Sequence, residues 1–146
     1  MAGMKKSPGA QELALLFAAL ADTTRLRLLN LIAGREVCVC YLVEVLRQGQ
    51  PKISRHLAYL RRAGIVQARR EGKWMHYRLS EPEKTEAAAV LAAVLAALRR
   101  EKPMQEDEAK LDRACCSPQK LVVPEGAPLP VAVAAVTRLK DREGRR

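Results

Sequence analysis

Two cysteines separated by one residue, Cys38 and Cys40, lie just before the most basic stretch of this 146-residue chain. Two more cysteines, Cys115 and Cys116, follow much later. Adjacent residues have Cα atoms about 3.8 Å apart, which is shorter than a disulfide between them normally requires. Because thiolates select soft metal ions and thiophilic metalloids, the four cysteines are candidate ligands for such an ion.

The first cysteine pair is expected at the start of a short helix over 41–47, with Arg35 close by. The positive end of the helix dipole and this guanidinium should lower the pKa of both thiols. Side chains two residues apart on a regular helix point about 200° away from each other. We therefore expect the pair to share an ion easily only where residues 38–40 are extended. If these residues form the first helical turn in the DNA-bound state, ligation must unwind that turn.

A strongly basic stretch follows the pair. Residues 47–78 contain nine Lys and Arg side chains and a single carboxylate, that of Glu71, in a chain whose net charge is +10. Each Lys or Arg placed on a phosphate releases condensed counterions, so this concentration of charge favours a polyanion such as DNA. The alternative interpretation is a solvated surface.

The elements that must position these residues follow from apolar spacing. Helices are expected over 11–20, 23–33, 41–47, 51–62 and 83–100. Asp22 is the expected N-cap of the second helix and Gln50 that of the fourth, with Pro51 at the first helical position. Alternating residues predict two strands, over 66–70 and 74–79, joined by a basic turn. The sequence thus predicts a mainly α protein with a small β-hairpin, in the order of a winged helix-turn-helix. A helical bundle with a hairpin is the alternative.

In a winged helix-turn-helix the fourth helix lies in the major groove of DNA, and the hairpin touches a neighbouring phosphate or the minor groove. The polar side of this helix offers hydrogen-bond donors and no carboxylates, which suits phosphates and base edges. The expected DNA contacts are Gln50, Lys52, Ser54, Arg55, His56, Tyr59 and Arg62 on the helix and Lys73 at the hairpin tip.

The last predicted helix is apolar on nearly all sides from Ala87 to Leu98. A helix of this kind cannot face water in so small a monomer, so we expect a homodimer formed through the terminal helices. The expected interface residues are Leu13, Phe17, Val90, Leu91, Val94, Leu95 and Leu98. We divide the chain into a DNA-binding and dimerisation domain over 1–100 and a partly irregular C-terminal tail over 101–146, which carries the Cys-Cys pair.

The sequence also bears on location and activity. No apolar run approaches the roughly 20 residues that cross a bilayer, so no membrane partner is expected. Residues 13–21 have helical spacing rather than the pattern of a secretory signal, which predicts a cytoplasmic protein. A reducing cytosol favours free or metal-bound thiols over disulfides. Without a C-x-x-C pair or a phosphate-type anion loop, an enzyme is not expected.

Four stretches in order, "LADTTRLRLLNLI", "VCVCYLVEVL", "QPKISRHLAYLRRAGIV" and "RREGKWMHYRL", carry a resemblance. Together they resemble the ArsR/SmtB family of metal-responsive repressors, in particular its arsenic-sensing branch, over roughly residues 11–100. The resemblance implies a homodimeric winged-helix repressor that leaves its operator DNA when a metal or metalloid binds. It also implies that Cys38 and Cys40 belong to the inducer site. The implied recognition-helix residues are Pro51, Lys52, Ser54, Arg55 and His56.

One position departs from the pattern of that branch. Its best-known arsenic sensors have a third cysteine three residues after the C-x-C pair, where this chain has Val43. Two thiolates cannot complete the three-coordinate site that As(III) or Sb(III), the expected inducers, prefer. At least one of Cys115 and Cys116 is therefore expected to join Cys38 and Cys40, within a subunit or across the dimer. A four-thiolate site for Cd(II), Pb(II) or Zn(II) is one alternative, and a metal-free thiol redox switch is another.

Overall fold

The computed structural model describes residues 8–116. In chain order the elements are α1 (Pro8–Leu20), α2 (Thr23–Ile32), β1 (Val37–Cys38), α3 (Val39–Leu46), α4 (Gln50–Arg62), β2 (Val66–Glu71), β3 (Trp74–Leu79), α5 (Thr85–Leu98) and α6 (Lys102–Cys116). Residues 117–146, which make up most of the predicted tail, lie outside the described residues.

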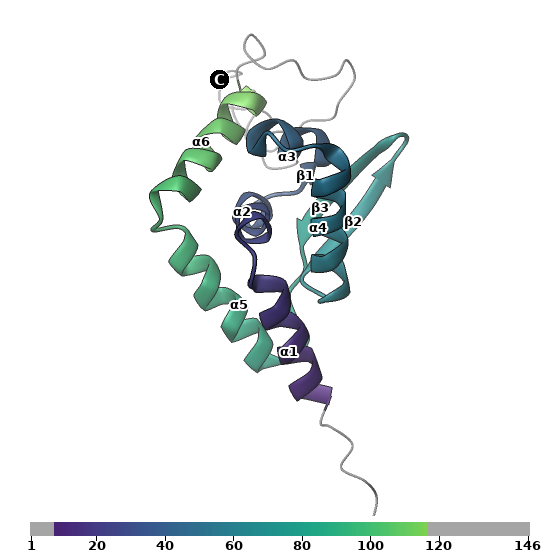
Figure 1. Cartoon of the computed structure of the whole chain (residues 1–146), viewed down its shortest axis with the longest axis vertical. Coiled ribbons are helices and arrows are strands. Elements are labelled where there is room, and N and C mark those ends of the chain that lie inside the picture. Colours follow the sequence, from purple (N-terminus) through teal and green to yellow (C-terminus); the bar gives the residue numbers. More distant parts are fainter. Residues whose placement is uncertain (1–7, 117–146) are drawn as a thin grey trace, which may run out of the picture.

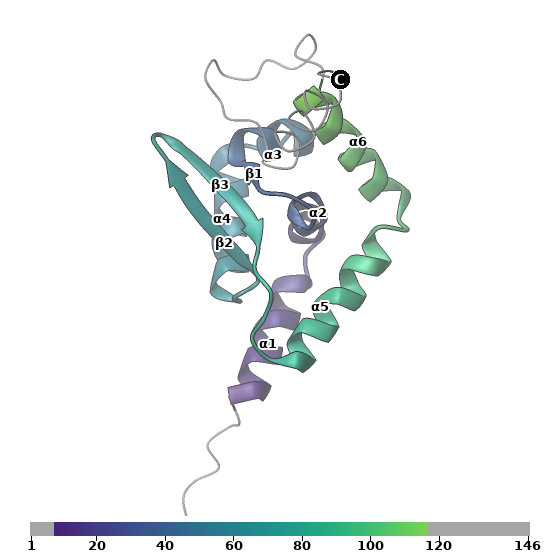
Figure 2. The same ribbon diagram turned by 180° about the vertical axis from the view of Figure 1, so that it is seen from behind.

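Helix α2 runs through the middle of the fold and is surrounded by other helices (Figure 1). Helices α1 and α5 lie side by side at one end, whereas α6 and α4 lie on opposite sides of α2, and α3 packs against α6 (Figures 1 and 2). The core consists almost entirely of aliphatic side chains, including Leu28, Leu29, Ile32, Leu42 and Ile53. Burial of Leu and Ile is therefore what holds the helices together in a chain with few aromatic residues.

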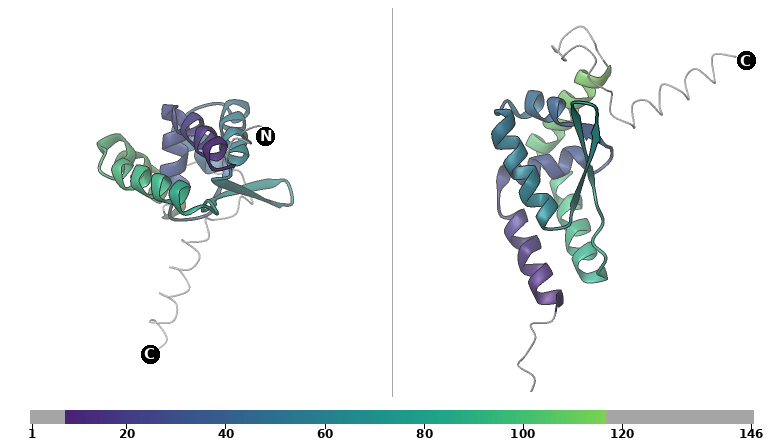
Figure 3. Two further views of the ribbon diagram at one scale, coloured as in Figure 1. Left: turned by 90° about the horizontal axis from the view of Figure 1, so that it is seen from below. Right: turned by 90° about the vertical axis from the view of Figure 1, so that its right-hand side faces the viewer.

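The sheet is antiparallel, with strand order β1-β3-β2. Strands β2 and β3 form a hairpin whose two-residue turn is Gly72-Lys73, and Gly72 adopts the positive φ of 58° that the first position of such a turn favours. The hairpin projects from the helical body (Figure 3). Strand β1 was not expected: Val37 pairs with Tyr77, and Cys38 pairs with His76.

The architecture confirms the predicted fold class. The order helix, short helix, turn, basic helix and hairpin is that of a winged helix-turn-helix. The Asp22 side chain accepts a hydrogen bond from the Arg25 backbone N–H, as expected of an N-cap. The described helices begin and end within three residues of the predicted bounds, with the exception of α6.

The predicted dimer contacts on α5 require a correction. Leu91, Leu95 and Leu98 are 2%, 9% and 8% exposed, so they belong to the core of the single chain. The spacing of these leucines places them on one stripe of α5, and that stripe packs against α1 and α2 of the same protomer. They are therefore not available as contacts for a second subunit.

Other residues of the terminal helices do face outward. Leu15 and Phe17 on α1 are 52% and 56% exposed. The exposed side of α5 consists of alanines, and Leu13, Val90 and Val94 are half-buried beside the core. The exposed alanines are Ala89, Ala92, Ala93, Ala96 and Ala97. Because Leu15 and Phe17 are two residues apart on α1 and point in opposite directions, we call only Phe17 and these alanines the terminal-helix face.

Helix α6 lies within the range that the sequence predicts as a partly irregular tail. Its buried residues Met104, Asp107, Leu111 and Ala114 recur at helical spacing and face α2 and α3. The stripe is narrow and contains a carboxylate, so apolar periodicity alone does not reveal it. No helix within residues 8–116 is long and apolar enough to span a membrane.

Candidate functional site

Helix α4 presents a polar side to solvent because its apolar residues recur at helical spacing. Ile53, Leu57 and Leu60 are fully buried, as predicted. The helix begins at Gln50, one residue earlier than expected, and Gly49 is its N-cap. Pro51 lies in the first turn, where its missing N–H leaves no hydrogen bond unmade.

The predicted DNA contacts on this helix are mostly accessible. Gln50, Pro51, Lys52, Arg55 and Arg62 are exposed, and Ser54 is half-buried. Among the described residues, no carboxylate lies within salt-bridge distance of the Lys52, Arg55 or Arg62 side chains. These cations are therefore available for phosphates or guanine edges.

The hairpin separates its basic residues into two groups. Arg69 is held by Glu36, at 2.6 Å, and Arg78 donates to the Gln67 side chain at 2.7 Å. Lys73 lies at the tip, exposed, with its Nζ 5.1 Å from the centre of the Trp74 ring. The tip can thus present a cation to DNA while the base of the hairpin is internally paired.

His56 and Tyr59, like Ser54, are half-buried. The His56 Nδ1 atom lies 3.5 Å from a terminal nitrogen of Arg25, and the Arg25 guanidinium lies over the Tyr59 ring at 4.2 Å. Both side chains therefore face α2 in part. Arg25 is not among the residues selected from the sequence.

The two sulfur atoms of the C-x-C pair already lie together, because the Cys40 thiol donates a hydrogen bond to Cys38 Sγ at 3.1 Å. Cys38 ends β1 and is the N-cap of α3, with extended φ and ψ of −66° and 141°, whereas Cys40 lies in the first helical turn. The 200° separation applies only to two helical residues, and Cys38 is not one. The condition under which joint ligation would unwind this turn, helical backbone at residues 38–40, is therefore not met at Cys38.

The two thiols differ in acidity. The hydrogen bond from Cys40 lowers the pKa of Cys38 to about 7, assisted by the backbone N–H groups of Val39 and Cys40 and opposed by burial. Donating that bond, together with burial, raises the pKa of Cys40. The expectation of two acidified thiols is thus confirmed for Cys38 and wrong for Cys40, since a pair this close shares one proton. Arg35 does not contact either thiol but pairs with Asp112.

The acidity of Cys38 is testable in a protein with serine at positions 115 and 116. Thiolate absorbance should rise with a midpoint near pH 7, so that Cys38 is a thiolate above that pH and a thiol below it. The variant Cys40→Ala removes the donor and should move the midpoint up, whereas Cys40→Ser keeps a hydroxyl donor and should move it less. A midpoint unchanged by Cys40→Ala would contradict this account.

Charged side chains surround the Cys38 strand. His76, the cross-strand partner of Cys38, is 2% exposed, and its Nε2 lies 3.1 Å from Glu71. Glu36 and Glu71 both pair with Arg69. Within the described part of the chain, no three His, Cys, Asp or Glu side chains are grouped closely enough to hold a metal ion. A third ligand for the thiol pair must therefore come from elsewhere.

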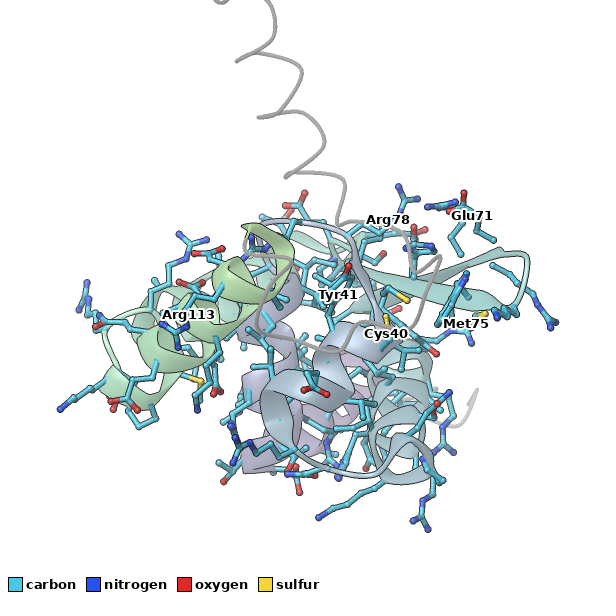
Figure 4. The ribbon with its side chains drawn as sticks, turned by 90° about the horizontal axis from the view of Figure 1, so that it is seen from above. Cys40, Tyr41, Glu71, Met75, Arg78 and Arg113 are labelled. Atoms are coloured by element: carbon cyan, nitrogen blue, oxygen red, sulfur yellow. The ribbon has the colours of Figure 1, made fainter. Side chains whose placement is uncertain are left out.

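Helix α6 is held on α2 and on the segment before Cys38 by polar contacts. Asp107, 2% exposed, accepts two hydrogen bonds from the Arg27 guanidinium at 2.7 and 2.9 Å. Near the end of α6, Asp112 pairs with Arg35 at 2.7 Å. Seen from above, Cys40 lies between Arg113 of α6 and the hairpin (Figure 4).

Cys115 and Cys116 are the last two residues of α6, one turn beyond Asp112. The ion pair of Asp112 with Arg35 therefore brings the backbone that carries the second cysteine pair toward the segment that leads to Cys38. The structure describes the backbone of Cys115 and Cys116 but not their side chains. Sequence reasoning missed Arg27, Arg35 and Asp112 as the residues that arrange this approach.

Comparison with known proteins identifies the family. Residues 22–68 match the model of the bacterial regulatory proteins of the arsR family. The chain is 51% identical over 77 residues to the arsenical resistance operon repressor of Escherichia coli K12, covering 52% of this chain and 66% of that protein. It is 39% identical over 101 residues to a probable mercury resistance operon repressor of Streptomyces lividans, covering 69% and 72%. The chain belongs to the ArsR family.

Two solved structures of this kind show the same fold. HlyU from Vibrio cholerae N16961 is 31% identical, with a TM-score of 0.54 over 62% of this chain and 96% of that chain. The antimony-specific transcriptional repressor AntR is 30% identical, with a TM-score of 0.52 over 66% of this chain and 85% of that chain.

The ArsR family assignment confirms the resemblance that the sequence carries. The family and its structural neighbours are DNA-binding transcriptional regulators rather than enzymes. The chain spans somewhat less than two thirds of the length of the Escherichia coli relative.

Proposed function

We propose that the protein is a homodimeric, cytoplasmic repressor that leaves its operator when As(III) or Sb(III) binds cysteine thiolates. The observation that carries the proposal is the pair of sulfur atoms 3.1 Å apart, one of them acidified, at the junction of β1 and α3. A thiolate at neutral pH is the donor that thiophilic metalloids prefer. The names of an arsenical resistance repressor and an antimony-specific repressor among the relatives support this inducer class.

Operator binding is assigned to α4 and the hairpin tip. The unpaired cations Lys52, Arg55 and Arg62 and the polar groups of Gln50 and Ser54 lie on one accessible side of α4. Lys73 extends this surface to the hairpin. A dimer formed through the terminal-helix face would present two copies of α4 to two operator half-sites.

The ligand set proposed for the inducer is Cys38, Cys40 and at least one of Cys115 and Cys116. The first two side chains are already adjacent, so binding to them alone requires little movement. An inducer shifts an equilibrium only through its different affinity for the two states, about 10⁴-fold for near-complete release. Recruitment of a thiolate from the end of α6 supplies that difference, because α6 packs on α2 and α3, and α3 packs on the DNA-reading α4.

Two alternatives make different use of the same thiols. Four thiolates would suit Cd(II), Pb(II) or Zn(II) in a tetrahedral site. A metal-free switch is favoured by the short distance between the Cys38 and Cys40 sulfurs, since oxidation by a peroxide would join them as a disulfide with reduction of the peroxide to water or alcohol.

A gel shift on the DNA upstream of the gene tests the function directly. Arsenite, antimonite, cadmium, zinc and peroxide are added in turn to the protein–DNA complex. Release by arsenite or antimonite at the lowest concentration is the expected result. Release by peroxide alone would favour the redox switch, and failure to bind the DNA at all would refute the repressor.

The placement of α4 in the major groove predicts the effect of removing its cations. Arg55→Ala should weaken operator binding by about 1–3 kcal/mol if Arg55 reads a base. Lys52→Ala should reduce the slope of log affinity against log salt concentration by about one, the value of one phosphate contact. Arg100→Ala removes an exposed cation at the end of α5 and serves as the control. Affinity unchanged in the Lys52 and Arg55 double variant, measured across salt concentrations, would exclude this placement.

A further inference from the structure

Arg25 lies where α1, α2 and α4 meet. Its Nε donates to the carbonyl of Ala19 at 2.7 Å, and a terminal nitrogen donates to the carbonyl of Ala18 at 3.1 Å. Both carbonyls belong to the last turn of α1, where the regular helical hydrogen bonds end; that of Ala18 also accepts from the Ala21 backbone N–H at 3.3 Å. A positive charge at a helix C-terminus is also favourable. These two bonds fix the plane of the guanidinium on the end of α1.

The same guanidinium contacts α4. Its central carbon lies 4.2 Å from the centre of the Tyr59 ring, and its other terminal nitrogen lies 3.5 Å from His56 Nδ1. His56 and Tyr59 are three residues apart and so lie on one side of α4. A lysine could not reproduce this arrangement, because an ammonium lacks the planar fork that reaches two carbonyls, an imidazole and a ring face together.

The contact with Arg25 also decides which nitrogen of His56 carries the hydrogen. A guanidinium has no acceptor, so Nδ1 must accept and the neutral ring bears its hydrogen on Nε2. The competing group is Asp22, whose carboxylate oxygen is 3.8 Å from Nδ1, too far for a hydrogen bond. That oxygen already accepts from the Arg25 backbone N–H at 3.0 Å. The Nε2–H group is then the donor that His56 can offer to an acceptor outside the protein.

We propose that Arg25 is a positioning residue for operator recognition. It holds α4 at a set orientation to α1 and keeps His56 in the tautomer that donates from Nε2 to a purine N7 in the major groove, where N7 is an acceptor. The proposal rests on the proposed function, in which α4 reads DNA and α1 contributes to the dimer face. It goes beyond that function by assigning a role to a residue that does not touch DNA.

The tautomer is measurable in the unmodified protein without DNA. The chain contains two histidines, so the ring nitrogens of His56 can be assigned by NMR with a His76→Gln variant as reference. We expect the resonances of a neutral ring with hydrogen on Nε2 and a bare Nδ1. Hydrogen on Nδ1 would overturn the proposal, and this result does not depend on whether an operator is bound.

The role in recognition is tested on operators in which single purines are replaced by deazapurines, which carry C–H instead of N7. For wild-type protein and the control Arg100→Lys, the deazapurine replacement at one operator position should lower the affinity about tenfold. Arg25→Lys and His56→Ala should bind the unmodified operator about tenfold more weakly and lose nothing further at that position. The double variant should be no weaker than either single variant, because the two residues act through one contact.

Controls separate this role from folding and from the proposed function. Thermal unfolding and sedimentation establish whether Arg25→Lys is folded and keeps its number of subunits. If Arg25→Lys does not fold, the deazapurine measurement is made with His56→Ala. Full purine sensitivity retained by Arg25→Lys, or effects that multiply in the double variant, would overturn the inference. Wild-type protein that binds no operator would instead refute the proposed function, and the tautomer measurement would still decide the contact.

Discussion

Replacing Cys38 and Cys40 with serine is expected to leave operator binding intact and to abolish release by arsenite. Neither side chain belongs to the basic surface of α4, so a thiol is not needed to hold DNA. A hydroxyl is a poor ligand for a thiophilic metalloid. Without metalloid binding, the shift of up to about 10⁴-fold in the ratio of free to bound operator that arsenite would cause is lost. The measurement is the fraction of bound operator as arsenite is titrated.

The tail cysteines provide the decisive comparison. A Cys115→Ser and Cys116→Ser double variant should also resist release, because two thiolates leave the three-coordinate site incomplete. If Cys38→Ser and Cys40→Ser are released normally while the tail variant is not, the site lies wholly in the tail. Mixed dimers of one subunit altered at the first pair and one altered at the tail then locate the site: restored release requires ligands from both subunits.

The second large effect is expected at the terminal-helix face. Phe17→Glu combined with Ala93→Glu should place charges where two protomers meet and convert the dimer to monomers. Because a monomer engages only one half-site, operator affinity should fall by roughly 10²–10⁴-fold. Analytical ultracentrifugation and a gel shift on the same preparations measure both quantities.

Two further variants show that the effect is specific to this face. Lys102→Glu places a carboxylate at an exposed position in the first turn of α6 and should change neither assembly nor affinity. Leu91→Glu buries an unpaired charge in the protomer core and should unfold the chain rather than dissociate it. A Phe17 and Ala93 double variant that remains dimeric and binds tightly would exclude this interface.

Much of the fold follows from local patterns, because the elements concerned are stabilised by nearby residues. Asp22 and Pro51 mark two helix starts, and the spacing of Ile53, Leu57 and Leu60 defines which side of α4 faces outward. The alternation in the hairpin and the turn at Gly72 likewise need no distant contact. The predicted outward side of α4 is therefore close to the one that the structure exposes.

The remaining features depend on contacts that a periodic pattern in the sequence does not reveal. A two-residue strand such as β1 has no period to detect, and it exists only because β3 pairs with it. The acidity of Cys38 and the opposite behaviour of Cys40 arise from a contact between the sulfurs that helical geometry alone would forbid. The burial of Leu91 and the partnership of Arg25 with the end of α1 are also properties of the assembled fold.

The pairing of β1 with β3 has a consequence for the order in which the protein is built. Val37 and Cys38 obtain their strand partners from Tyr77 and His76, about forty residues later in the chain. A ribosome adds roughly 5–20 residues per second, and distant pairings must overcome loop-closure entropy before they form. A nascent chain that ends before Trp74 contains both thiols and the complete reading helix but lacks the strand that secures Cys38. The C-x-C pair therefore reaches its folded arrangement only after β3 has been synthesised, later than helix α4.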